Sequence, residues 1–119
     1  MRSSVELWSI PPDSGAVGQH ILRGPIVRPG VLFYHVILYP VLPFTFGDGC
    51  TLDFGTQLLP TLFFSAINPV AFTAGTVFTS TTPGAGPPYY GVPDYFTVTV
   101  NGADVTAGEV ELLVETVRL

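Results

Sequence analysis

Glycine and proline recur at short intervals along the whole chain, and this spacing limits what the chain can fold into. Of 119 residues, 13 are glycine and 12 are proline. Proline breaks the interior of a helix and glycine weakens it, whereas short runs rich in Val, Ile, Phe, Tyr and Thr between such residues are typical of strands. The pattern predicts strands near Val5–Ile10, Ala16–Leu22, Val31–Tyr39, Val41–Phe46, Cys50–Phe54, Thr61–Ala66, Thr76–Thr81, Tyr95–Val100 and Glu109–Val117.

Many short strands separated by turn residues indicate a sandwich or a jelly roll. A chain of 119 residues can bury one hydrophobic core and is too short for two. We therefore predict an all-β fold, a jelly-roll-like antiparallel β-sandwich with long Pro/Gly-rich loops, formed by a single domain over residues 1–119. Residues 1–14 are expected to form an extended N-terminal arm, and residues 80–94 an extended loop rich in Pro and Tyr.

Two of the predicted strands carry apolar residues on both faces. Strict alternation in VLFYHVILY puts one set of side chains on one face and a second set on the other: Val31, Phe33, His35, Ile37 and Tyr39, against Leu32, Tyr34, Val36 and Leu38. A strand with one face in water normally alternates with polar residues. One face is therefore expected to meet the core, and the other either a neighbouring subunit or a covering loop.

The C-terminal EVELLVETVRL alternates at first and then leaves Leu113 and Val117 among the outward glutamates. Either a bulge shifts the phase or that outer face is covered. A helix competes, because Thr106 and Glu109 have the spacing of a capping box. The valines and the preceding YFTVTV favour a strand.

The segment FGDGCTLDFG holds the only cysteine, Cys50, between two carboxylates, Asp48 and Asp53. Neighbouring carboxylates raise the pKa of a thiol, which is the opposite of what a nucleophile needs. The segment also lacks the run of oxygen ligands found in calcium loops. We interpret Gly47–Gly49 as a tight turn, with Cys50 as a small core residue on the following strand.

Several other functions are disfavoured by the composition and motifs. The net charge is −5, and the four basic residues are arginines that do not cluster, so nucleic-acid binding is not expected. The most apolar segment, Val31–Phe44, is too short to cross a bilayer and contains two prolines, so no membrane contact is expected. MRSSVELWSIPPDSG does not read as a signal peptide, which predicts synthesis in a reducing cytoplasm. Zinc, P-loop, dinucleotide and nucleophile-elbow motifs are missing, so we expect no enzyme activity and no cofactor.

Charged residues make up 11% of the chain, well below the usual share of about 25%. Apolar surface on a soluble domain usually marks a contact site, so the composition is that of a subunit in an assembly. The loop tyrosines and Asp94 have the chemistry that lectin-like sandwiches use on sugars, but anchoring an interface is favoured for them. The candidate interface residues are Trp8, Tyr34, Leu38, Pro87, Pro88, Tyr89, Tyr90, Tyr95, Leu113 and Val117.

The order of these features resembles that of small β-sandwich structural proteins of tailed bacteriophages. The matching pieces are a G-A-V-G strand at Gly15–Gly18, a strand entry at Pro29–Gly30, a hairpin at Gly49–Gly55 and a terminal strand at Val105–Glu115. The Pro/Tyr-rich loop and the aromatic middle strands depart from that pattern. The resemblance implies a virion component of the kind that clamps or decorates the capsid shell.

We therefore expect a non-enzymatic phage capsid decoration (cement) protein that bridges capsid subunits. Its expected partner is the major capsid protein, and its expected state a homo-oligomer, with a trimer favoured. It would be made in the host cytoplasm and end on the capsid exterior of the virion. The alternatives are a neck, tail or baseplate component, and a carbohydrate-binding or host-attachment module that uses Tyr89, Tyr90 and Tyr95.

Overall fold

The computed structural model of the chain describes residues 2–73, 75–80, 89–90 and 92–118. These residues form nine strands and one short 3₁₀ helix: β1 (Arg2–Ile10), β2 (Gly18–Ile21), β3 (Val31–Phe46), β4 (Thr51–Thr56), β5 (Phe64–Ile67), η1 (Pro69–Ala71), β6 (Phe78–Ser80), β7 (Tyr89–Tyr90), β8 (Phe96–Asn101) and β9 (Val105–Arg118). No α-helix occurs among these residues. No helical segment that they form is long and apolar enough to span a membrane.

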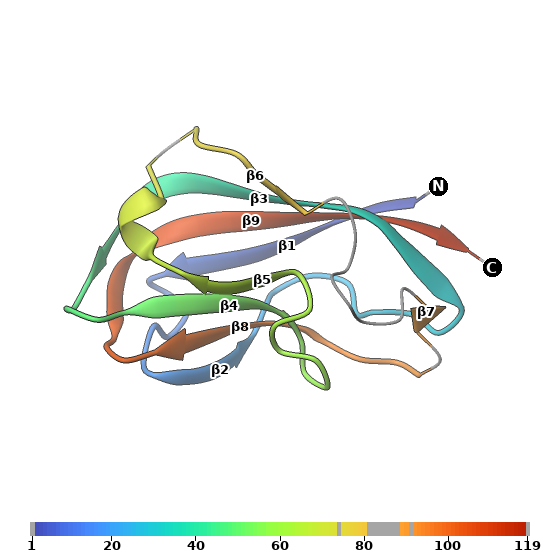
Figure 1. Cartoon of the computed structure of the whole chain (residues 1–119), viewed down its shortest axis with the longest axis horizontal. Helices are drawn as coiled ribbons and strands as arrows, with labels where there is room; N and C mark the ends of the chain where they lie inside the picture. The colour runs from blue at the N-terminus through green and yellow to red at the C-terminus, as the bar shows by residue number, and fades with distance from the viewer. Residues whose placement is uncertain (1, 74, 81–88, 91, 119) are drawn as a thin grey trace.

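The strands form two antiparallel sheets that face each other as two layers (Figure 1). The first sheet has the order β1-β9-β3-β6, with β7 also paired to β3, and the second has the order β2-β8-β4-β5. Strands pair from the two ends of the chain inwards: β1 with β9, β2 with β8, β3 with β6, and β4 with β5. The chain is thus one long hairpin rolled up so that successive pairs alternate between the sheets, which is the jelly-roll topology. This confirms the predicted all-β sandwich.

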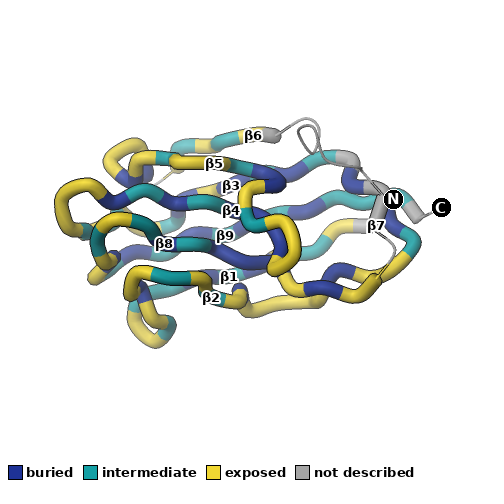
Figure 2. The backbone as a smooth tube through the Cα atoms, turned by 60° about the horizontal axis from the view of Figure 1, so that its bottom comes forward, coloured by how far each residue is buried: buried dark blue, intermediate teal, exposed yellow. Residues whose placement is uncertain are grey.

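The core lies between the sheets and is built from the inward face of each strand. Along β9, Val110, Leu112 and Val114 are each 1% exposed, while the residues between them are half-buried. Figure 2 shows this alternation of buried and less buried positions along the strands. Phenylalanines fill the space between the layers, with Phe33 edge-on to Phe63 at a centroid distance of 5.1 Å. The C-terminal segment is a strand, as predicted, and not the competing helix.

The expected N-terminal arm is wrong for residues 2–10, because they form β1, an ordered edge strand paired along its length with β9. Trp8 anchors it: the side chain is 1% exposed and its Nε1 donates a hydrogen bond to the Ser14 carbonyl oxygen at 3.1 Å. The large apolar area of an indole is better placed in the core than on a free arm. Residues 2–10 therefore belong to the sandwich.

The two strands predicted between Val31 and Phe46 are one strand, β3, which is 16 residues long. Its ladder with β9 shifts register between Phe33 and His35 and again beyond Pro40. The first shift changes the phase of the strand, because a bulge inserts one extra residue. Val31 and Phe33 are therefore buried together with Val36 and Leu38, and the strict alternation predicted from the sequence is wrong.

Candidate functional site

The FGDGCTLDFG segment forms the corner predicted for it. Gly47–Gly49 connects β3 to β4, and the Cys50 amide closes the turn on the Gly47 carbonyl oxygen at 3.4 Å. Cys50 is 3% exposed, and burial, together with the charge of Asp104, raises the pKa of its thiol. A buried thiol with a raised pKa is a poor nucleophile. This segment is structural.

Asp53, the second carboxylate of that segment, is also committed to the fold. Its Oδ1 accepts the Ala66 amide at 2.6 Å, and its Oδ2 accepts the Asn101 side-chain amide at 3.0 Å. Within the described residues, no three His, Cys, Asp or Glu side chains gather where they could hold a metal ion.

The outer surface of the first sheet is the candidate site. In the middle of this sheet, Val5 on β1 lies opposite Leu113 on β9, and Leu113 lies opposite Ile37 on β3. Side chains opposite each other across a ladder are about 5 Å apart, so the three form one apolar row. Leu7 and Tyr39 lie beside this row, on either side of Glu111. We call Val5, Leu7, Ile37, Tyr39 and Leu113 the outer apolar face.

These side chains remain accessible to a partner. Val5 is 46% exposed and Tyr39 38%, while Leu7, Ile37 and Leu113 are half-buried. The described chain therefore leaves apolar side chains from three adjacent strands uncovered on one surface. A contiguous apolar surface of this kind is typical of a contact site.

Carboxylates interrupt and border the outer apolar face. Glu109, Glu111 and Glu115 project from β9 on the same side as Leu113, since they are an even number of residues away. Glu109 accepts a hydrogen bond from Ser9 Oγ at 3.0 Å, and Glu115 Oε1 is 3.1 Å from Nδ1 of His35 on β3. The face thus combines an apolar centre with net negative charge, and its complement is an apolar surface edged by basic groups.

Of the ten predicted interface residues, two lie on this side of the sheet: Leu113 and Val117, both half-buried. The prediction that Trp8 and Leu38 lie at an interface is wrong, because they are 1% and 0% exposed and lie in the core. Leu38 was assigned outward because the bulge before His35 was not anticipated. The predictions for the side chains of Tyr34, Tyr89 and Tyr90, and for Pro87 and Pro88, lie outside the described residues.

Sequence reasoning missed Val5 and Leu7. Their strand reads VELW, and the sequence analysis did not assign the faces of this strand. In the structure Glu6 and Trp8 point inward and Val5 and Leu7 outward. Tryptophan, the largest apolar residue of the segment, was the signal that indicated the correct phase.

Asp94, the carboxylate of the sugar-binding alternative, is not available to a ligand. Asp94 is 5% exposed, its Oδ1 accepts the Tyr95 amide at 2.7 Å, and its Oδ2 accepts the Leu58 amide at 3.2 Å. Both oxygens are therefore used inside the chain. Tyr95 itself is 46% exposed, away from the outer apolar face.

Comparison with solved structures finds this fold in two phage capsids. A chain of the cyanophage Pam1 capsid asymmetric unit matches 97% of this chain and 82% of its own length, with a TM-score of 0.68 and 19% identity. A chain of the capsid of Ralstonia phage GP4 matches 99% of this chain and 85% of its own length, with a TM-score of 0.65 and 16% identity. No family model and no curated protein matches the sequence. The likeness establishes the jelly-roll fold.

Proposed function

We propose that the chain is a non-enzymatic structural protein of a phage virion, and more specifically a capsid decoration (cement) protein that bridges subunits of the head. The observation that carries this proposal is the match to chains from two phage capsids over nearly the whole of this chain. The outer apolar face supplies the surface for assembly, and the committed carboxylates and buried thiol of the described residues offer no catalytic group.

The mechanism that we infer is repeated apolar docking. The outer apolar face lies on the capsid exterior across a joint between major capsid subunits, and its glutamates meet basic groups there. Burying apolar surface contributes about 25 cal/mol per Å² before the costs of association. A homotrimer engages three such joints at once, and this multivalency raises the overall affinity without new contacts.

The test uses the purified protein and empty heads assembled from major capsid protein without it. We expect the protein to run as a trimer by light scattering, to pellet with the heads, and to raise their melting temperature. A monomer that stays in the supernatant with heads would contradict the proposal, and the next measurement would then be binding to a glycan array.

Copy number separates a head decoration from the neck, tail or baseplate alternative. Decoration predicts a count per virion that scales with the number of capsid subunits, measured by quantitative mass spectrometry of purified virions. A small fixed count, with the protein located at the tail by immunogold microscopy, would replace the decoration role with a tail role.

A further inference from the structure

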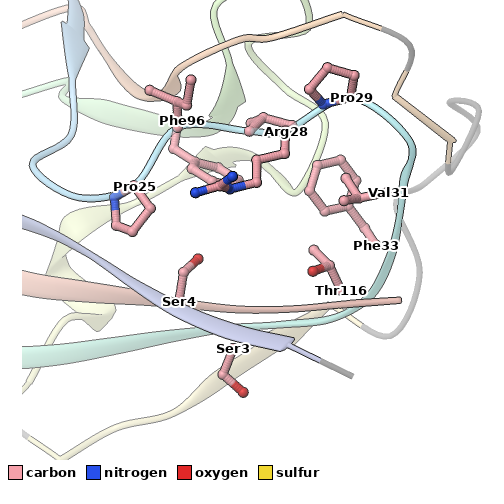
Figure 3. Close-up of a pocket in the computed structure, with 11 residues that line it drawn as sticks. Ser3, Ser4, Pro25, Arg28, Pro29, Val31, Phe33, Phe96 and Thr116 are labelled. Atoms are coloured by element: carbon pink, nitrogen blue, oxygen red, sulfur yellow. The ribbon is translucent and has the colours of Figure 1, made fainter. Parts of the chain in front are cut away.

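A cavity of about 620 Å³ lies where the first sheet extends beyond the second. In the first sheet, β3 and β9 continue to Val31 and Arg118, whereas in the second sheet the β8–β4 ladder ends at the pair Phe96 and Thr56. The segment between β2 and β3 covers the overhang, and its two prolines, Pro25 and Pro29, line the cavity. Figure 3 shows the cavity between that segment and the strands of the first sheet.

The cavity is amphipathic. Val27, Phe33 and Phe96 are each at most 3% exposed and form its apolar wall. Ser4 and Thr116 add hydroxyl groups from β1 and β9. A cavity of this size with an apolar wall and a few polar groups is typical of a binding site.

Arg28 supplies a cation to this cavity. Its side chain reaches over the cavity toward Ser4 (Figure 3) and belongs to an exposed residue. The ion pairs of the described residues join Arg23 to Asp13 and His35 to Glu115, and neither uses Arg28. Among the described residues, no carboxylate forms an ion pair with this guanidinium. The charge that complements it is an anion from outside the described chain.

The neighbouring edge of β1 is closed at Leu7 and Ser9 and open at Ser3 and at the amide of Val5. Leu7 exchanges two backbone hydrogen bonds with Arg23, at 2.8 and 3.0 Å, and the Ser9 amide and carbonyl oxygen are hydrogen-bonded to Asp13. The backbone N–H and C=O groups of these odd-numbered residues therefore point away from β9. The backbone N–H and C=O groups of Ser3 and Val5 point the same way, but Gly24 packs against the Val5 carbonyl oxygen and Pro25 has no N–H to donate. Beyond Pro25 the cavity separates Ser3 and Ser4 from the covering segment. Within the described residues, the amides of Ser3 and Val5 have no hydrogen-bond acceptor.

We propose that the cavity and the open edge of β1 together bind an extended acidic segment of a partner polypeptide. The segment adds to the sheet as a strand, with backbone hydrogen bonds to Ser3 and to the amide of Val5. Alternate side chains of an added strand point to the same face, so an apolar side chain enters the cavity and a carboxylate two residues away pairs with Arg28.

The partner is a different polypeptide and not a second copy of this chain. Five of the nine side-chain carboxylates lie within strands that are already paired, and the other four lie in turns and connections: Glu6, Glu109, Glu111, Glu115 and Asp53, against Asp13, Asp48, Asp94 and Asp104. A second copy could therefore offer a carboxylate on an extended, unpaired segment only by breaking one of its own sheets or unfolding a connection. This inference does not depend on the decoration role.

The test uses a blocked synthetic peptide, Thr-Val-Glu-Val-Phe-Thr, titrated into isotope-labelled protein and followed by amide NMR shifts. We expect shifts at Ser3, Val5 and Arg28. Arg28→Gln should weaken binding about tenfold, because a hydrogen-bonded charge pair is lost. Arg23→Gln is the matched control, since it removes the same cation elsewhere and should leave the affinity unchanged.

Two further variants distinguish the parts of the proposal. Ser3→Pro removes an N–H on the open edge while leaving the ladder with β9 intact, and should weaken binding at least about fivefold. The peptide with Lys in place of Glu should not bind. Equal binding of wild type and Arg28→Gln, equal binding of the Lys peptide, or self-association through β1 without peptide would each overturn the proposal.

Discussion

Glu6 is a carboxyl group in an apolar setting. It is 1% exposed on the inward face of β1, between Ser4 and Trp8, and its Oε2 has no hydrogen-bond partner among the described residues. Gly24 passes so close that a side chain there would collide with this carboxyl group. Burial disfavours the charged form, which raises the pKa of Glu6 from 4.5 to about 8.

This raised pKa predicts a pH-dependent stability. Because the folded protein holds the proton more tightly than the unfolded chain, the stabilisation is complete below pH 4.5 and is lost as the pH rises to about 8. The loss is at most about 1.4 kcal/mol per pH unit in that window. Glu6→Gln should therefore unfold like wild type at pH 4.5 and be more stable at pH 8, as measured by urea denaturation. An equal gain at both pH values would show that the effect is not titration.

Among the elements, two tight turns at one end of the sandwich depend on each other. The β3–β4 turn contains Gly49 and the β8–β9 turn contains Gly102, with φ angles of 79° and 82°. A Cβ on Gly102 would also collide with the carbonyl oxygen of Gly49. Glycine at Gly102 thus satisfies two requirements, a left-handed backbone and a close approach between turns.

Gly102→Ala should therefore cost about 2–4 kcal/mol of unfolding free energy, from backbone strain and overpacking combined. The matched control is Gly75→Ala, where φ is also positive, at 85°, but the space for a methyl group is open. This control should cost about 1 kcal/mol. Equal losses in thermal or urea unfolding would mean that the contact between the turns contributes nothing.

The sequence predicted the number and type of elements better than their phase. Period-2 patterns and turn residues located most of the strands, because both signals are local. The bulge before His35 left no local signal, and it decided that Leu38 is buried while Ile37 faces outward. The inward orientation of the Glu6 side chain was also not predictable, because the segment around Gly24 that buries it comes from elsewhere in the chain.

For the whole molecule, the outer apolar face predicts how assembly can be blocked without unfolding. Leu113→Lys places an ammonium group in the centre of that face, where it interrupts apolar contact and repels a basic partner surface. We expect at least a tenfold loss of co-sedimentation with empty heads and a change in unfolding free energy below about 1 kcal/mol, because the site is half-buried.

Val70→Lys is the matched control for this substitution. Val70 is 68% exposed on η1, away from the outer apolar face, so the same change in charge there should leave binding to heads intact. Similar losses for both variants would show that net charge, and not this face, governs assembly.

The rolled-hairpin topology also determines when the protein can fold. The β1–β9 ladder joins Arg2 to Thr116, and only the β4–β5 pair is close in sequence among the four nested pairs. β1 therefore has no partner until the ribosome has released β9, and the first sheet cannot form before then. Chains dominated by such distant pairings fold in milliseconds to seconds, far more slowly than helical bundles. During that interval the unpaired strands are exposed to one another on neighbouring nascent chains, so the rate of synthesis, as well as the final stability, limits the yield of assembled protein.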